Sequence, residues 1–410
     1  MPFIERKEFQ KYQETIMVAV YSDRVSAYAI GKNAAGYNIV AGATEEQEEA
    51  RLNPVRTDVH PGGDPMVGQG ELNTGKIKLN CQKALQRLPR EHMKSGMPVV
   101  FALGPGASEC AFVSIDARRE QKDAIISESE VKSIIERSYG LKASESGKAS
   151  LNVPAGFLVD GFSVPDPVGL NGQNITVNLV SVSASRALEE SFSDIASSYG
   201  LRYGGMVNIC GMLADAMPLF TQDADCVAML VFEREIILAL VRGKKISAIG
   251  KADGGYGILE QEAARSFSVG IEEAKNILRA FEKKQTDAAR LNPVRTDVHP
   301  GGDPMVGQAV AEKINELSAR VVSDIARRIG SALPKLDFEH LIPATFLVAQ
   351  FGNLSHLSQA LIDNPTWLAQ APVARNAGVA RMSPLKQNIQ DDKKVLADGD
   401  AYILTALMRS

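Results

Sequence analysis

The chain has 410 residues, of which 45 are basic and 49 acidic, so its formal charge is -4. This length exceeds one ordinary domain and predicts two or three domains, each with a core of its own. The near balance of charge excludes the strongly basic surface that binding to nucleic acid or to an anionic membrane requires. The N-terminal stretch MPFIERKEFQKYQE lacks the apolar centre of a secretory signal, and no apolar run approaches the length of a membrane span. We therefore expect a cytoplasmic protein that does not bind nucleic acid.

Strand-like and helical patterns alternate along the chain, which predicts an α/β architecture. In the first half we expect a strand pair at 15–31 and 37–42, a helix at 74–88, strands at 98–104 and 109–117, a helix at 127–140, a strand at 175–184 and a helix at 185–200. The second half continues with a strand meander at 226–250, two helices within 258–288, a long helix at 309–333, a strand at 342–352 and a helix at 399–408. Ser127 and Glu130 form a capping-box pattern at the start of their helix, and Gly270 separates the helix pair.

One stretch of twenty residues, ARLNPVRTDVHPGGDPMVGQ, occurs at 50–69 and again, unchanged, at 289–308. Its three prolines and three glycines predict a loop rather than a regular helix or an interior strand. The two copies lie in unlike surroundings, and the chain joins sensibly when both are removed. We therefore interpret them as insertions into surface loops, either translated dispersed palindromic elements or engineered tags, where added length costs little closure entropy.

The residues that commonly bind metals or react as nucleophiles are scattered. Four cysteines, Cys81, Cys110, Cys210 and Cys226, form no CxxC pair and are expected to be small buried hydrophobic residues. Within the repeated segment, His60, Asp58 and Asp64 offer oxygen and nitrogen ligands, but one histidine does not make a zinc site. We expect no bound metal and no catalytic triad.

The central stretch NVPAGFLVDGFSVPDPVGLNGQNITVNLVSVSAS, residues 152–185, resembles the bacterial cell-division protein FtsA. The resemblance is carried by Val159-Asp160-Gly161 and by the segment from Pro165 to Gly172, and it extends through NTGKIKLNCQKAL and KADGGYGILEQEAARSFSVGIEEAKNIL. It implies an α/β, actin-like fold of the actin/Hsp70 superfamily, with two lobes, a cleft between them and a small inserted α+β domain of the SHS2 type. The implied limits are 1–84 for the first part of lobe I, 85–165 for the small domain, 166–223 for the rest of lobe I and 224–410 for lobe II.

FtsA binds ATP in its cleft, and the resemblance implies two phosphate-binding hairpins with an Asp-x-Gly pattern. In such a pattern, glycine lets backbone amides approach the anion and the carboxylate orders Mg2+ and water. Here the first hairpin has Tyr21 and Asp23 in the places of Asp and Gly, and the second has Phe232 and Arg234. We expect these bulky side chains to fill the phosphate space.

The nucleoside side of the implied cleft departs from the family pattern as well. Lys275 and Leu278 stand where the family has a glutamate and a lysine, and a late diglycine turn is replaced by the segment 349–353. Only Gly254 and Gly255 remain as residues that could bind a cofactor. The pattern favours a pseudo-ATPase without a cofactor; ATP and Mg2+ are expected only if the cleft is functional, and the choice between enzyme and non-enzyme stays open.

Three functions are compatible with these residues. The first is an FtsA-like adaptor in cell division, which has lost ATP and contacts an FtsZ-like protein, other division proteins or itself. The second is an ATP-dependent filament former, and the third is a pilus-assembly scaffold of the PilM type. The chain stops at AYILTALMRS, without the amphipathic anchor helix that ends FtsA, so we expect any recruitment to the membrane to come through a partner.

Overall fold

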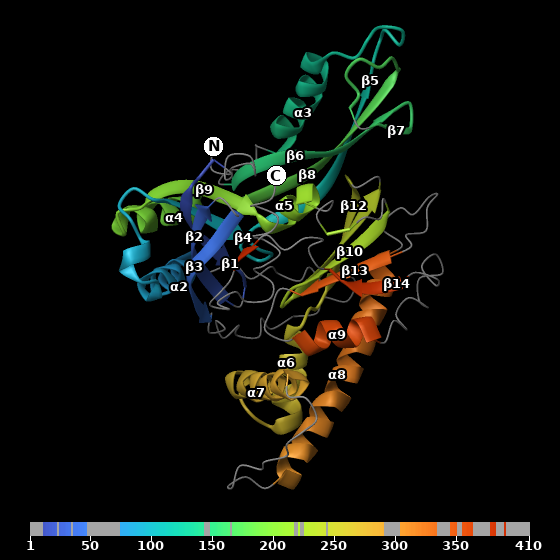
Figure 1. The fold of residues 1–410 in the computed structure, drawn as a ribbon. Coiled ribbons are helices and arrows are strands. Elements are labelled where there is room, and N and C mark those ends of the chain that lie inside the picture. The colour runs from blue at the N-terminus through green and yellow to red at the C-terminus, as the bar shows by residue number, and fades with distance from the viewer. Residues whose placement is uncertain are drawn as a thin grey trace, which may run out of the picture.

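A computed structural model describes the chain at 11–22, 24–33, 36–46, 74–142, 148–164, 166–216, 220–221, 225–242, 245–290, 304–333, 345–350, 355–363, 378–382 and 389–390. These residues form three β-sheets with helices packed against them (Figure 1). The predicted α/β class is confirmed. The first repeated segment and the predicted helix at 399–408 lie outside the described residues.

The first sheet has six strands in the order β15-β3-β2-β1-β4-β9. Its strands are β1 (Glu14–Val20), β2 (Arg24–Asn33), β3 (Gly36–Glu46), β4 (Pro98–Leu103), β9 (Arg202–Asn208) and β15 (Ile389–Gln390). Helices α2 (Thr74–Arg87) and α4 (Arg186–Ser198) lie side by side against it, and a short helix η1 (Arg90–His92) follows α2. The rings of Phe101 in β4 and Phe192 in α4 stack with their centroids 4.0 Å apart, which joins the helix layer to the sheet.

The second sheet has five strands in the order β12-β11-β10-β13-β14. Its strands are β10 (Cys226–Val231), β11 (Glu235–Arg242), β12 (Lys245–Asp253), β13 (Thr345–Gln350) and β14 (Gly378–Arg381). Helices α6 (Gly257–Phe267), α7 (Ile271–Arg290), α8 (Pro304–Ala332) and α9 (Ser355–Asp363) accompany this sheet. The alternating side chains of β10 divide between two cores: Met229 packs in the cluster that includes α8, and Leu230 packs in the cluster of the first sheet.

The two larger sheets share one topology. In each, three successive antiparallel strands are followed by a parallel strand beside the first of them: β1 pairs with β2 and β4, and β10 pairs with β11 and β13. The turns β1–β2 and β10–β11 therefore hold equivalent places in the two sheets. Helix α5 (Ile209–Ala216) lies between the sheets, where Ile209 and Cys210 belong to the shared hydrophobic cluster.

The third sheet has four strands in the order β5-β8-β6-β7 and extends away from the other two (Figure 1). It consists of β5 (Glu109–Arg118), β6 (Lys148–Val159), β7 (Phe162–Val164) and β8 (Asn174–Ser185), with α3 (Glu128–Lys142) on one face. The backbone amide of Glu130 donates to Ser127 Oγ at 3.2 Å, as the capping pattern predicts. The sheet includes β8, beyond residue 165, and the domain limits themselves stay a prediction.

Strand β6 was not predicted from the sequence. It contains Pro154, which removes one ladder donor, but the register with β8 shifts between Pro154 and Gly156. A bulge is one of the few places where an interior strand accepts proline. We also did not predict the strands β7, β9, β14 and β15 or the helices α5 and α9.

The second repeated segment corrects the expectation that both copies are loops throughout. Helix α7 runs to Arg290, two residues into the copy, and α8 begins at Pro304, inside its last five residues. Proline suits the first turn of a helix because the amide that it lacks would have no helical partner there. The predicted helix at 309–333 therefore begins earlier than expected, and the middle of this copy lies outside the described residues.

Candidate functional site

The turn between β1 and β2 is one of the two places where the family resemblance implies phosphate contacts. The backbone amide of Tyr21 donates to the carbonyl of Arg24 at 2.9 Å and closes the turn. Tyr21 is 2% exposed and Arg24 is 1% exposed, and the guanidinium carbon of Arg24 lies 4.2 Å from the centroid of the Tyr21 ring. This turn is therefore filled by an aromatic ring with a buried cation on its face.

Gly104 lies directly behind this ring. Its amide donates to the carbonyl of Val20 at 2.9 Å, and a Cβ added at Gly104 would lie 2.9 Å from Cδ1 of Tyr21. Glycine at this position makes room for the tyrosine. Tyr21 could be predicted from its own hairpin, but Gly104 could not, because 82 residues lie between the two in the sequence.

The turn between β10 and β11 is the second implied phosphate site, and the same type of bond closes it. The amide of Phe232 donates to the carbonyl of Glu235 at 3.0 Å. Phe232 is 3% exposed and Glu233 is 4% exposed, whereas the Arg234 side chain is 53% exposed. Of the two residues that replace Asp and Gly, Phe232 therefore fills the inside of the turn, while Arg234 extends to the surface.

The diglycine pair packs on this second turn. The amide of Gly254 donates to the carbonyl of Arg234 at 2.7 Å, and Gly254 has a φ of +84°. A Cβ on Gly255 would fall 1.6 Å from the carbonyl oxygen of Phe232. The next two amides, those of Tyr256 and Gly257, donate to the carbonyls of Phe232 and Glu233. Within the described residues, both glycines thus have a structural reason to be glycine that involves no cofactor, and a role in cofactor binding stays a prediction.

Glu235, whose carbonyl closes this turn, has a largely buried carboxyl group close to the charged side chains of Lys251 and Asp253. Burial raises the pKa of the Glu235 carboxyl, and Asp253 raises it further, while Lys251, whose Nζ lies 4.0 Å from Oε2, opposes the shift. An acid with a raised pKa is a candidate general acid wherever a substrate can reach it. Among the described residues, the buried thiols of Cys110 and Cys210 also interact electrostatically with Glu235.

The nucleoside side of the implied cleft is occupied by a buried ion pair and a core residue. Lys275, whose side chain is 5% exposed, places Nζ 3.8 Å from Oε2 of Glu260 and 3.4 Å from Oε1 of Glu272. Leu278 is fully buried in the core of the second sheet, and Ala349, near the end of β13, is fully buried in the cluster that includes the first sheet. Residues 351–353, where the family has its late diglycine turn, lie outside the described residues.

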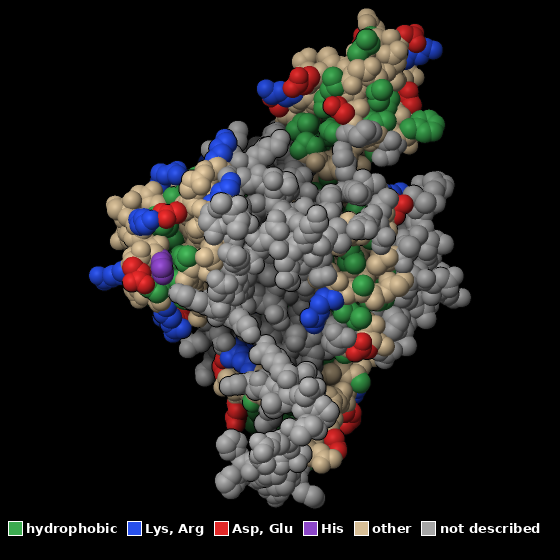
Figure 2. Space-filling view, viewed as in Figure 1, with side chains coloured by type: hydrophobic (Ala, Val, Ile, Leu, Met, Phe, Trp, Pro, Cys, Tyr) green, Lys and Arg blue, Asp and Glu red, His purple; other side chains and the backbone are tan. Residues whose placement is uncertain are grey.

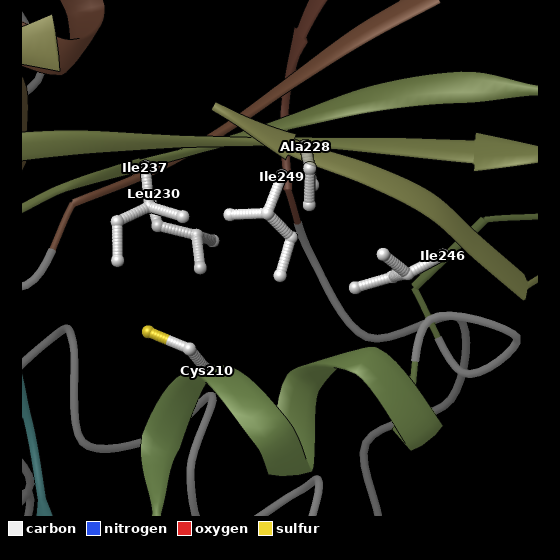
Figure 3. Close-up of a pocket in the computed structure, with 7 residues that line it drawn as sticks. Cys210, Ala228, Leu230, Ile237, Ile246 and Ile249 are labelled. Atoms are coloured by element: carbon white, nitrogen blue, oxygen red, sulfur yellow. The ribbon is translucent and has the colours of Figure 1, made fainter. Parts of the chain in front are cut away.

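A small apolar pocket lies between α5 and the second sheet (Figure 3). It is lined by Cys210, Ala228, Leu230, Ile237, Ala239, Ile246 and Ile249. The thiol of Cys210 points into it, and the hydrogen bond to Cys110 together with burial raises the pKa of Cys210. The pocket has room for about one water molecule, too little for a nucleotide, and its thiol is a poor nucleophile.

All four cysteines are free and buried, as predicted. Among the described residues, no group of three or more His, Cys, Asp or Glu side chains is placed to hold a metal ion. No helix in the described part of the chain is long and apolar enough to cross a membrane.

The comparisons with known proteins identify the fold. No family model and no curated protein matches the sequence. The chain is similar to a solved structure of the PilM-PilN type IV pilus biogenesis complex, with a TM-score of 0.59 at 13% identity over 96% of this chain and 97% of that chain. It also matches the ethanolamine utilization protein EutJ from Carboxydothermus hydrogenoformans, at 11% identity and a TM-score of 0.46, over 96% of this chain and 90% of that one. The chain has the actin-like ATPase fold, as the sequence resemblance predicted.

Proposed function

We propose that this protein is an actin-fold scaffold that acts through protein–protein contacts and has lost ATP binding. The observation that carries the proposal is the pair of filled turns, Tyr21 with Arg24 on one sheet and Phe232 on the other. A phosphate between such turns needs exposed amides and an ordered cation. In both turns the first amide is already bonded within the turn, and a buried aromatic side chain occupies the inner position.

Two cellular settings are proposed, and they are equally well supported. The segment 165–172, PDPVGLNG, favours an FtsA-like adaptor in bacterial cell division, which would contact an FtsZ-like protein. The likeness to the PilM-PilN structure over nearly the whole chain favours a pilus-assembly scaffold, since that structure is a type IV pilus biogenesis complex. In either setting the partner is a protein, and recruitment to a membrane would come through that partner.

Calorimetry and thermal unfolding with Mg2+ and ATP test the loss of nucleotide binding. A ligand at a hundred times its dissociation constant stabilises the folded state by about 2.7 kcal/mol, which is readily measured. We expect no heat of binding and no stabilisation, while an actin-fold ATPase in the same buffer gives both. A clear stabilisation by ATP would contradict the proposal and favour the alternative, an ATP-dependent filament former.

The two settings are separated by testing the purified chain against an FtsZ-like protein and against a PilN-like protein. Binding to the first alone supports the division adaptor, and binding to the second alone supports the pilus scaffold. If the chain instead binds ATP and forms filaments that sediment, both settings are wrong and the protein is an ATP-dependent filament former.

A further inference from the structure

The four-stranded sheet ends in a group of exposed apolar side chains. Only five large hydrophobic residues in the described part of the chain are exposed, and four of them lie at this end of the sheet. They are Ile125 (66% exposed), Phe162 (76%), Val168 (42%) and Leu170 (40%), and we call them the tip surface. Figure 2 shows hydrophobic side chains gathered on this domain. Exposed apolar residues are ordinary when single, but a group of four on one small domain indicates a binding surface.

A buried arginine holds the segments that carry the tip surface. The guanidinium of Arg119 donates to the carbonyls of Ala124 and Gly172, both at 2.8 Å. It also pairs with Oε1 of Glu130 at 2.7 Å, although only 7% of the Arg119 side chain is exposed. One side chain therefore ties the loop before α3 to the loop before β8.

Backbone bonds join the same two loops. The amide of Ile126 donates to the carbonyl of Leu170 at 2.8 Å, and the amide of Gly169 donates to the carbonyl of Ile126 at 3.0 Å. The turn that precedes Phe162 is joined to them, since Asp160 accepts hydrogen bonds from the amides of Gln173 and Asn174. The apolar side chains are thus positioned before any partner arrives, which lowers the entropic cost of binding.

The charges around the tip surface are mostly negative. In 118–130 and 160–172 the exposed charged residues are the five acids Glu120, Asp123, Glu128, Asp160 and Asp166 and the two bases Arg118 and Lys122. An anionic membrane would be repelled by such a rim, since peripheral proteins use basic residues at the lipid surface. A protein segment that carries basic residues beside apolar ones is complementary both to the acidic rim and to the apolar side chains of the tip surface.

We propose that the tip surface binds a basic, amphipathic segment of a partner protein. The proposal deepens the scaffold function and rests on it, because it names the surface and the chemistry of one partner contact. The apolar side chains of the partner would cover Ile125, Phe162, Val168 and Leu170, and its lysines or arginines would face the acidic rim.

The probe is a synthetic peptide of about 15 residues with leucine on one helical face and lysine on the other. Its binding to the full chain is measured by fluorescence anisotropy, for the wild type and for the double variant Ile125→Ser, Phe162→Ser. Leu79→Ser is the matched control, because Leu79 is 50% exposed but lies on α2, far along the chain from the tip. Thermal unfolding checks that each variant is folded.

We expect the double variant to lose about tenfold or more in affinity, as is typical when two interface anchors are truncated, and the Leu79→Ser variant to keep wild-type affinity. We also expect a peptide with glutamate in place of lysine not to bind. Equal peptide binding by wild type and folded double variant would overturn the proposal, even if the absence of ATP binding still supported the scaffold function.

The same variants also test two other molecules as the partner of the tip surface, a second copy of this chain and a lipid membrane. If sedimentation shows an oligomer of the wild type that the double variant breaks, the tip surface is an interface between copies of this chain, and the proposal is wrong. If the wild type but not the double variant floats with phosphatidylglycerol vesicles, the surface binds lipid and the proposal is wrong as well.

Discussion

The turns β1–β2 and β10–β11 are equivalent in topology and are closed by the same type of hydrogen bond, but the space beside them is filled by different means. In the first, side chains fill the space: the ring of Tyr21 lies under the guanidinium of Arg24. In the second, the diglycine segment packs its backbone on Phe232, so that a Cβ on Gly255 would meet the Phe232 carbonyl oxygen at 1.6 Å. A side chain that fills a space can be replaced by another of similar size. Where backbone packs against backbone, there is no room for any side chain. The second turn should therefore tolerate substitution less well than the first.

Gly255→Ala is the strongest test of this difference. The added methyl cannot be accommodated without moving the backbone of the β10–β11 turn, because the obstructing atoms are backbone atoms. We expect a loss of about 3 kcal/mol or more in the free energy of unfolding, the upper range for overpacking. Chemical denaturation measures it, and Gly31→Ala is the control, since nothing lies within 4 Å of the position of its Cβ. A stable, fully folded Gly255→Ala variant would show that the diglycine turn is free to move.

The first turn is tested by a double-mutant cycle of Tyr21→Leu and Arg24→Met. Both substitutions keep an apolar side chain in the buried site, but Tyr21→Leu removes the aromatic ring and Arg24→Met removes the cation. We expect a coupling free energy of about 1–2 kcal/mol, as for a desolvated cation over an aromatic face. Additive effects of the two substitutions on chemical denaturation would mean that the stacked geometry contributes nothing of its own.

The smallest effect is expected from Glu235→Gln, at the base of the second turn. Burial raises the pKa of Glu235 in the folded state. The folded protein thus holds this proton more tightly than the unfolded chain, so stability falls as pH rises through the folded-state pKa. The glutamine variant lacks this penalty and should unfold at a higher temperature at neutral pH. The gain should vanish below pH 4.5, the ordinary pKa of a glutamate, where the wild type is also neutral.

Thermal unfolding at several pH values measures this difference. Its control is Glu316→Gln, on the exposed side of α8, which should change the unfolding temperature little at any pH. A lower unfolding temperature for Glu235→Gln at neutral pH would show that the ion pair with Lys251, 4.0 Å away, outweighs the cost of burial.

The sequence by itself determined most of the elements and the fold class. The continuous apolar runs of β10 and β11 and the amphipathic period of α8 are local patterns, so the strands and the helix could be predicted. The cap at Ser127 and the absence of an Asp-x-Gly pattern at Tyr21 and Phe232 were equally visible, because each needs only a few adjacent residues. The start of α8 at Pro304 was missed because its prolines and glycines were taken as evidence for a loop throughout.

Only the tertiary structure decided what these residues contact. A role of Gly255 in cofactor binding stays a prediction, but the structure shows that the absence of a side chain at this position lets it pack on Phe232, more than twenty residues earlier in the chain. Arg119 gave no signal in the sequence, yet it holds the tip surface through Ala124 and Gly172. Such contacts join segments that have no local pattern in common. They exist only once the sheets have formed and packing has removed the alternatives. The fold and the bulky residues in its two turns could therefore be predicted, whereas the glycine contacts behind those residues could not.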